Sequence, residues 1–248
     1  MQAIIGGSGL AKLADLQLER REVVRTPYGD PSCALSFGRF NGVPVVFLAR
    51  HGYGHTLAPH QINYRANLWA LQQVGVSQIF AVASVGGIRA DCGPGALVLP
   101  DQIIDYTYDR AHTFFEGPDR PVTHVDFTAP YSESVRERLR QGAQAAGEAL
   151  VDGACYGCTQ GPRLETAAEI RRMARDGCDL VGMTGMPEAA LARELGIAYG
   201  VLAVVVNHAA GQGTSRTVIS VEAMQSVMES AVQRARRVLA HALTAPEA

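Results

Sequence analysis

Residues 158–170, CTQGPRLETAAEI, and residues 179–187, DLVGMTGMP, form the stretch around which this chain is organised. Thr166 and Glu169 have the spacing of a capping box, in which each side chain bonds the backbone N–H of the other at a helix start. The spacing predicts a helix that begins after Glu165 and ends a few turns later. A carboxylate held at a helix entrance can accept hydrogen bonds from a ligand.

The second half of the stretch predicts a buried strand followed by another helix. Leu180 and Val181 form a short apolar run, and Pro187 is typical of the first turn of a helix. Thr184 then lies beside exposed backbone N–H groups, which favour an anion. Together the two halves suit a ligand with a polar heterocycle at one end and a phosphate at the other. An ordinary capped helix and strand–helix turn would show the same pattern.

Length and composition favour one α/β domain. The chain has 248 residues, 47% of them hydrophobic, which is enough for one large core in a single domain over 1–248. A net charge of −2 without a block of Lys or Arg argues against a nucleic-acid partner. The N-terminus lacks a basic region before its apolar run, and no stretch reaches the roughly 18 apolar residues of a membrane span. We therefore expect a cytoplasmic protein with no membrane partner.

The cysteine and histidine patterns do not predict a metal site. The cysteines are odd in number and scattered, and Cys155 and Cys158 lack a second pair to complete a zinc site. We interpret the cysteines as reduced core residues, with a redox role for this pair as the alternative. The histidines between 51 and 60 have neither helical spacing nor a nearby carboxylate. These residues are Cys33, Cys92, Cys155, Cys158 and Cys178, and His51, His55 and His60.

Two predicted strands end in groups suited to an anion. The apolar run 3–5 leads into a glycine-rich loop in which bare N–H groups and Ser8 can contact a phosphate. A dinucleotide fingerprint would need Gly or Ala where Lys12 stands, which disfavours that alternative, and a plain turn remains open. Residues 34–49 predict a hairpin around Asn41–Gly42, and its second strand leads directly to Arg50, a candidate anion ligand.

The rest of the chain predicts alternating helices and strands around a mixed central β-sheet, an α/β fold with flanking helices. We expect a second small-residue loop at 84–87, and a long functional or partner-packing loop between Pro100 and Tyr131. Asn207 ends an apolar strand, where it either recognises a polar edge or caps a turn. The predicted helices are 61–75, 131–147 (a charged surface helix), 188–195 and the segment after Ser220, and the further strands are 78–83, 96–99, 151–156 and 201–206.

Taken together, the motifs resemble the trimeric purine nucleoside phosphorylase and methylthioadenosine phosphorylase family. They are GGSGL, TPYG, RHG, HQINYRANLWAL, SVGG, GPRLET, VGMTGMPEAALA and the strand end at Asn207. They cover nearly the whole chain in the order and spacing of the family. Within it, the chain is most similar to the bacterial S-methyl-5′-thioinosine phosphorylases, and the resemblance implies the nucleoside phosphorylase type of sheet.

The resemblance also implies the binding residues. Those implied to bind phosphate are Ser8, Arg50, His51, Thr184 and Ser84, the last through its backbone. The ribose would lie over Met183 and near Leu164, where many relatives carry Phe. Asn207 would donate its amide protons to purine N7 and O6, and Glu165 would accept from N1–H of a 6-oxopurine. His51, Asn207 and Glu165 are the implied catalytic residues, and adenine-preferring relatives carry Asp in place of Asn207.

The 5′ end of the sugar is assigned by the same resemblance. Counting without gaps from Asn207, Val221 falls where inosine and guanosine phosphorylases carry a His that contacts the 5′-hydroxyl. An apolar residue there favours a methylthio group, although Val221 also fits the apolar stripe of the last helix. His124 would reach the 5′ pocket of a neighbouring subunit, which implies a homotrimer, and Ala209 joins the substrate-binding residues.

The implied activity is that of a pentosyltransferase in purine salvage. It would cleave S-methyl-5′-thioinosine with phosphate to hypoxanthine and S-methyl-5-thio-ribose 1-phosphate, with inorganic phosphate as co-substrate and no cofactor or metal. A general 6-oxopurine nucleoside phosphorylase is the alternative. A methylthioadenosine phosphorylase and a nucleoside-binding module without catalysis are less favoured.

Overall fold

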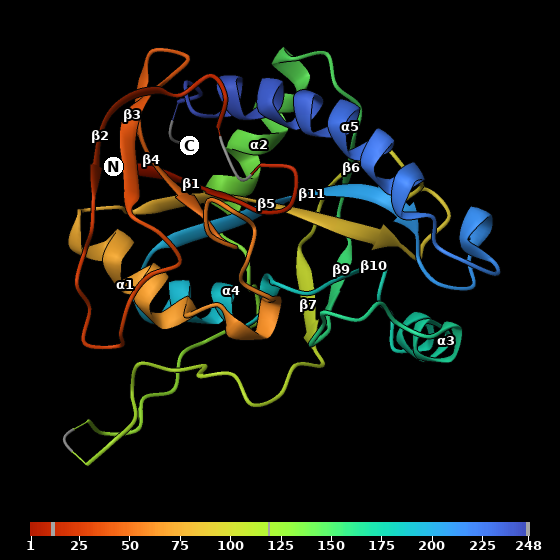
Figure 1. Cartoon of the computed structure of the whole chain (residues 1–248), viewed down its shortest axis with the longest axis horizontal. Coiled ribbons are helices and arrows are strands. Elements are labelled where there is room, and N and C mark those ends of the chain that lie inside the picture. Colours follow the sequence, from red (N-terminus) through yellow and green to blue (C-terminus); the bar gives the residue numbers. More distant parts are fainter. Residues whose placement is uncertain (11–12, 119, 247–248) are drawn as a thin grey trace.

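One mixed β-sheet with helices on both faces forms the body of the protein (Figure 1). The computed structural model describes residues 1–10, 13–118 and 120–246, so Lys12, which disfavoured a dinucleotide fingerprint, lies outside the described residues. Within these ranges the sheet contains eleven strands, some parallel and some antiparallel. The expected α/β architecture with a mixed central sheet is therefore confirmed.

Strand β5 (Gln78–Gly87) is the centre of the sheet. β1 (Gln2–Gly6) pairs with it in parallel on one side and β11 (Ala198–His208) in parallel on the other. β10 (Leu180–Gly182) pairs antiparallel with Gly86 and Gly87, the last two residues of β5. The loop predicted at 84–87 is wrong, because β10 and β11 both supply backbone partners that continue β5 as a strand.

The first hairpin extends the sheet beyond β1. β4 (Val43–Ala49) runs parallel to β1, β3 (Leu35–Phe40) pairs antiparallel with β4, and β2 (Gln17–Glu22) forms the edge. Asn41 and Gly42 both have positive φ, 49° and 79°, which confirms the predicted tight turn. The sequence does not predict β2, because all its side chains are exposed and no apolar alternation marks it.

Short strands extend the sheet on its other side. β9 (Cys155–Cys158) pairs with β10, and β7 (Gln102–Asp105) pairs with β9. β6 (Leu97–Leu99) pairs with β11, and β8 (Leu150–Asp152) pairs with β6. The single strand expected at 151–156 is therefore two strands with different partners.

The helices lie in two layers (Figure 1). α2 (Glu133–Ala145) and α5 (Val221–Ala242) cover one face, and α1 (Tyr64–Gln73) and α4 (Gly185–Glu194) cover the other. α3 (Ala167–Arg175) lies beside β9 and β10. The sheet is thus buried on both faces across its centre.

The side chains of β11 alternate between the two layers. Leu202 and Val204 belong to the same buried cluster as Val238 of α5, whereas Val201 and Ala203 belong to the cluster on the α1 and α4 face. Successive side chains of a strand point to opposite faces, so a strand between two helical layers is apolar throughout. This explains why the run 201–206 is continuously hydrophobic.

Side-chain caps set three helix starts. The Thr166 side chain accepts from the N–H of Glu169 and the Glu169 carboxylate accepts from the N–H of Thr166, which confirms the capping box. Ser220 caps α5 as predicted. Asn63 caps α1 by accepting from the N–H of Ala66, so this helix begins at residue 64 and not at 61.

Helix α2 is not simply a charged surface helix. Arg138 is buried and donates to the carbonyls of Ala242 and Leu243 over 3.0 and 2.8 Å. Arg136 is also buried and bonds Asp152 of β8 over 2.5 Å. Both arginines tie α2 to neighbouring elements, so the surface prediction is wrong for this side of the helix.

The segment between β7 and α2 projects from the body at the lower left of Figure 1. A loop is expected at 100–131, and its described residues from 106 on contain neither helix nor strand, as expected. The first part of the range instead forms β7, because β9 offers an edge with which it pairs. Buried Arg110 anchors this segment to the body.

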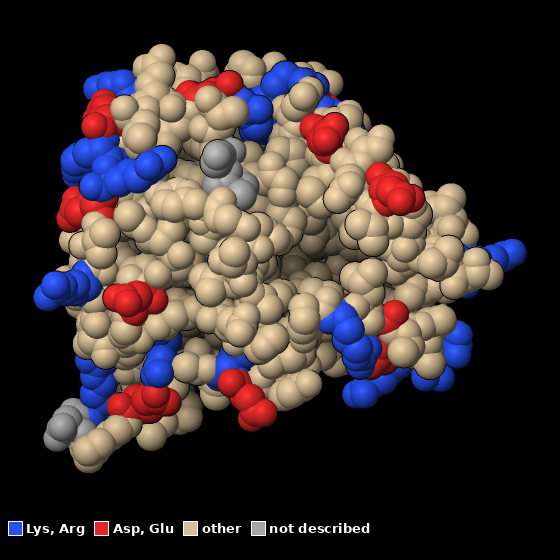
Figure 2. Space-filling view, viewed as in Figure 1, with Lys and Arg blue, Asp and Glu red and all other residues tan. Residues whose placement is uncertain are grey.

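Charged side chains of both signs lie around the edge of one face, and an uncharged hollow lies near its centre (Figure 2). In the portion of the chain that is described, no helix combines the length and apolar character needed to cross a membrane.

Candidate active site

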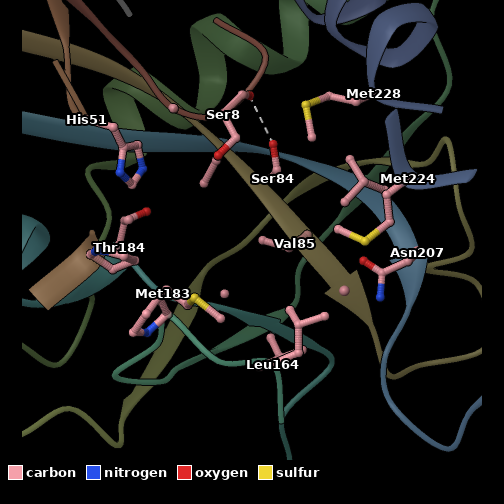
Figure 3. Close-up of a pocket in the computed structure, with 18 of the residues that line it drawn as sticks. Ser8, His51, Ser84, Val85, Leu164, Met183, Thr184, Asn207, Met224 and Met228 are labelled. Carbon is pink, nitrogen blue, oxygen red and sulfur yellow. Dashed lines mark hydrogen bonds between the residues drawn. The ribbon is translucent and has the colours of Figure 1, made fainter. Parts of the chain in front are cut away.

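A cavity of about 200 Å³ lies at the carboxyl ends of β1, β4, β5 and β11. In Figure 3, Ser8, His51 and Thr184 gather on one side of it, and Asn207 lies on the opposite side. Met183 and Leu164 line the lower wall of the cavity in this view, and Met224 and Met228 of α5 line its upper wall. The strand ends therefore bring together residues that are far apart in the sequence.

The loop after β1 packs closely against β5. Ser84 donates its hydroxyl proton to the carbonyl of Ser8 over 3.1 Å (Figure 3). Gly7 is required by this approach, since a Cβ there would lie 2.8 Å from the carbonyl oxygen of Val82 and 2.9 Å from Nη1 of Arg50. Ser8 Oγ makes a long contact of 3.5 Å with Nε2 of His55, which a ligand oxygen can replace.

Arg50 is buried and held by a carboxylate. Its Nε and Nη2 donate to Glu188 over 2.7 Å each, and Nη1 donates to the carbonyl of Val82 over 2.9 Å. Burial works against the charged guanidinium, but Glu188 outweighs it and raises the Arg50 pKa above its usual range. These three bonds leave one N–H on Nη1 and one on Nη2, which can donate to an anion in the cavity that Arg50 lines.

His51 is a neutral ring with a defined tautomer. Its Nδ1 lies 2.8 Å from the carbonyl oxygen of Leu57, which can only accept, so Nδ1 carries the proton. Burial is the main cause that lowers the pKa of His51 to about 4, and the nearby charge of Arg50 acts in the same direction. Nε2 is therefore a hydrogen-bond acceptor at neutral pH, suited to an oxygen that carries a proton.

Thr184 stands between β10 and α4. Its side chain makes no capping bond to the helix, and its backbone N–H lies 3.5 Å from the hydroxyl of Tyr156. The cavity is lined by Thr184 and by Met183 beside it. A polar hydroxyl next to a helix start is available to an anion, as the sequence pattern indicates.

Asn207 and Glu165 supply the polar groups at the other end. Asn207 lies at an irregularity in the pairing of β11 with β5, and its Nδ2 donates to the carbonyl of His208 over 2.6 Å. Glu165 accepts from the hydroxyl of Thr159 over 2.7 Å. Burial raises the pKa of the Glu165 carboxyl, and the Thr159 hydrogen bond opposes this.

Three residues assigned to the substrate do not line this cavity. Val221 is the first residue of α5 and is 62% exposed. The residues of α5 that line the cavity are Met224 and Met228, further along the helix. Ala209 is buried in a small core cluster with Val181, behind the cavity wall. His124 is exposed on the segment between β7 and α2.

Several residues of the site were not expected from the sequence. Glu188 accepts two hydrogen bonds from Arg50, and Tyr199 donates its hydroxyl proton to the same carboxylate over 2.7 Å. Arg110 donates to the carbonyls of Met183 and Gln160, over 2.9 and 2.8 Å, and so joins the two halves of the stretch that carries the site. A carboxylate within the apolar run MPEAALA is a signal that could have identified Glu188.

The described residues include no group of three or more His, Cys, Asp or Glu side chains placed to hold a metal ion. The five cysteines are free thiols, and Cys92, Cys158 and Cys178 are buried.

Known proteins resemble this chain in fold and in sequence. A methylthioadenosine phosphorylase from Schistosoma mansoni, solved in complex with adenine, superposes with a TM-score of 0.93 at 30% identity, over 98% of this chain and 90% of that one. A probable S-methyl-5′-thioinosine phosphorylase of Pseudomonas syringae pv. tomato is 51% identical over 98% of both chains. A 6-oxopurine nucleoside phosphorylase of Pyrococcus furiosus is 45% identical over 93% of this chain and 89% of its own.

The fold and the strand-end cavity are of the nucleoside phosphorylase class. The chain belongs to the Phosphorylase superfamily, whose family model matches residues 2–244.

Proposed function

We propose that this protein is a pentosyltransferase that cleaves S-methyl-5′-thioinosine with phosphate, releasing hypoxanthine and S-methyl-5-thio-ribose 1-phosphate. The observation that carries the proposal is the polarity of the cavity. Ser8, His51 and Thr184 form an anion-binding end, and Glu165 and Asn207 form a hydrogen-bonding end. A phosphate and a purine bound at these ends leave the sugar between them, in contact with Met183 and Leu164.

The proposed reaction needs positioning more than a general base. Phosphate is already anionic and attacks C1′ while the bond from C1′ to the purine nitrogen breaks and its electrons move onto the base, which takes up a proton from water to leave as hypoxanthine. Asn207 stabilises this growing charge by donating an N–H toward N7 and O6, and the anion end, where Arg50 and the Ser84 backbone contribute donors, holds phosphate close to C1′. Inorganic phosphate is the co-substrate, and the steps require no organic cofactor or metal.

Base selectivity follows from the direction of the hydrogen bonds. An ionised Glu165 accepts from the N1–H of hypoxanthine or guanine, whereas adenine presents a lone pair at N1 and an amine at position 6. A mismatch against Glu165 and Asn207 leaves buried polar groups unpaired, which costs several orders of magnitude in kcat/KM. The relatives named for methylthioinosine and 6-oxopurine nucleosides support this choice. A methylthioadenosine phosphorylase ranks below it, although the solved structure with adenine shares the fold.

The preference at the 5′ position rests on the apolar wall of the cavity. Met224 and Met228 of α5 line it, and a thioether side chain packs well against a methylthio group. The two thioether side chains offer a 5′-hydroxyl no strong hydrogen-bond partner, so this wall favours the methylthio group. A general 6-oxopurine nucleoside phosphorylase remains the second candidate, supported by the archaeal relative.

We further propose a cytoplasmic homotrimer in which His124 reaches the 5′ pocket of a neighbouring subunit. The exposed segment between β7 and α2 supports this arrangement, because it projects from the body (Figure 1). The free thiols fit a reducing compartment. Light scattering checks the assembly, and a fully active monomer would exclude the assignment of His124.

The deciding experiment measures release of free base from methylthioinosine, inosine, guanosine and methylthioadenosine, each with and without phosphate. We expect phosphate-dependent turnover with the highest kcat/KM for methylthioinosine. Comparable use of inosine would support the general 6-oxopurine activity, and equal use of methylthioadenosine would refute the roles of Asn207 and Glu165. Binding of these compounds without any turnover would identify a nucleoside-binding module.

A further inference from the structure

Thr159 follows β9 and is anchored from two directions. Its N–H donates to the carbonyl of Gly182 over 2.8 Å, which continues the pairing of β9 with β10. Buried Arg110 donates to the carbonyls of Thr159 and Gln160 over 3.3 and 2.8 Å, and to that of Met183 over 2.9 Å. The Thr159 side chain therefore starts from a backbone position that is tied to the wall of the active-site cavity.

The hydroxyl of Thr159 reaches the carboxylate of Glu165. Its Oγ1 lies 2.7 Å from Oε1 of Glu165 and 3.3 Å from the carbonyl oxygen of Gly182. A hydroxyl has a single proton to donate, and the shorter bond to an ionised carboxylate is the stronger one. This bond occupies Oε1 and leaves Oε2 as the acceptor for a ligand.

We propose that Thr159 is a positioning residue for purine recognition, whose hydroxyl keeps Glu165 ionised and oriented with Oε2 presented to the N1–H of a 6-oxopurine. The inference rests on the proposed function. Among the described residues that line the active-site cavity, Glu165 is present and Thr159 is not, so Thr159 acts on the base only through Glu165.

Two opposing effects set the charge of Glu165. Burial is the larger and raises its pKa, while the hydrogen bond from Thr159 is the strongest of the causes that lower it. Charges also act from Glu169, which raises the pKa, and Arg163, which lowers it. Arg163 is bound to Glu169 over 2.7 and 2.9 Å and its side chain is 69% exposed, so solvent screens its effect. The backbone N–H of Glu165 also lowers this pKa, but less than Thr159 does, so the Thr159 hydroxyl is the largest single support for the ionised form.

Glu165 also borders a second cavity, of about 370 Å³, on the side of Tyr106, Tyr108 and Arg172. Two polar side chains there have other partners: Tyr106 donates its hydroxyl proton to Asp176 over 2.8 Å, and Arg172 lies 3.6 Å from the same carboxylate. Glu165 thus has open space on two sides. Without Thr159 its carboxylate can turn toward either cavity.

The protonation of Glu165 decides which purine edge it matches. An ionised carboxylate accepts from the N1–H of a 6-oxopurine, whereas a carboxylic acid donates to the bare N1 of a 6-aminopurine. Loss of the Thr159 hydroxyl should therefore weaken the use of 6-oxopurine nucleosides most strongly at acid pH.

The test compares wild type, Thr159→Val and Thr159→Ser by the pH profile of kcat/KM for methylthioinosine at saturating phosphate. Val has the shape of Thr without the hydroxyl, and Ser keeps the hydroxyl. Activity requires the ionised carboxylate, so it is full above the pKa of Glu165 and is lost below it. We expect the acid limb of Thr159→Val to move to higher pH by about one pH unit or more, and Ser to restore it. Titration of phosphate itself is common to all three proteins.

A purely structural role would lower kcat/KM equally at every pH. Superimposable acid limbs for wild type and Thr159→Val, or a Ser variant that behaves like Val, would overturn the inference. If Thr159→Val does not fold, Thr159→Ala takes its place. A carbon-13 NMR titration of the Glu165 carboxyl, identified by its loss in Glu165→Gln, reads the same shift without turnover. If wild type releases no base from methylthioinosine, the proposed function fails, and this titration decides the role of Thr159 by itself.

Discussion

Arg50 and Glu188 face each other in the protein interior through two hydrogen bonds of 2.7 Å, with side chains 1% and 0% exposed. Arg50 follows β4 and Glu188 lies in α4, a helix that covers one face of the sheet. The ion pair therefore ties the anion end of the cavity to this helix. The charge of Arg50 is already balanced. Its contribution to phosphate binding is therefore directional N–H donation more than net attraction.

Replacing Glu188 by Gln should reduce the free energy of unfolding by about 3–5 kcal/mol, because it leaves a buried cation without its counter-ion. Tyr199→Phe, which removes one hydrogen bond to the same carboxylate, should cost about 1.5–3 kcal/mol. Denaturant unfolding measures both. Glu22→Gln is the matched control, since its pair with Arg20 is exposed on β2 and its loss should change stability by less than about 1 kcal/mol. Equal effects of the buried and the exposed substitution would contradict this account.

His51 should remain neutral and protonated on Nδ1 in the ligand-free protein through the neutral range. Nitrogen-15 NMR of the ring should show this tautomer and a titration midpoint well below the ordinary value, since burial lowers the pKa of His51 from 6.5 to about 4. The unfolded chain takes up this proton at higher pH than the folded one, so stability should fall as pH decreases from about 6.5 to about 4. A midpoint near the ordinary value, or a proton on Nε2, would be incompatible with the Leu57 hydrogen bond.

Asn207→Asp should reduce kcat/KM for methylthioinosine by about 10²-fold or more, because it replaces a donor at the developing negative charge by a carboxylate. The new carboxylate would also face the carbonyl of His208, which the amide now contacts over 2.6 Å. Kinetics with methylthioinosine and methylthioadenosine measure the change, and the ratio should move toward the adenine nucleoside. Asn41→Asp, in the exposed hairpin turn, is the control for the same chemical change and should leave both rates unaltered.

Met224→Ala and Val221→Ala separate two assignments of the 5′ pocket. Met224 lines the cavity and Val221 is 62% exposed, so only Met224→Ala should reduce the preference for methylthioinosine over inosine, by about 10-fold or more. Comparison of the two kcat/KM ratios decides. A larger effect of Val221→Ala would restore the assignment made by counting from Asn207, and would mean that α5 moves when substrate binds.

Local signals in the sequence predicted local structure correctly. The Asn41–Gly42 turn and the capping box at Thr166 depend on residues next to each other, so their physical cause is contained in a few positions. β2 and β7 carry no such signal, because partner strands supply their hydrogen bonds; the side chains of β2 are exposed, and only the two central side chains of β7 are partly buried. Pairing with β10 and β11 likewise explains why residues 84–87 form strand and not loop.

The candidate site shows the same division. Arg50, Thr184 and Asn207 could be named from the sequence because each follows a predicted strand, and the ends of such strands are where ligands bind. Glu188 and Arg110 could not, because their roles depend on contacts with residues many positions away. Thr159 lies close to Glu165 in the sequence, yet only the folded chain shows that its hydroxyl points at the carboxylate.

By itself the sequence determined the α/β class, the strand–turn–helix units and the kinds of chemical group at each strand end. Periodicity, turn residues and caps act over a few residues, and a single chain displays them directly. The tertiary structure alone decided the order of strands around β5, the pairing of Arg50 with Glu188, and the place of Met224 and Met228 at the cavity in preference to Val221. These features depend on which distant segments pack together, and burial and hydrogen bonding between such segments have no local signature.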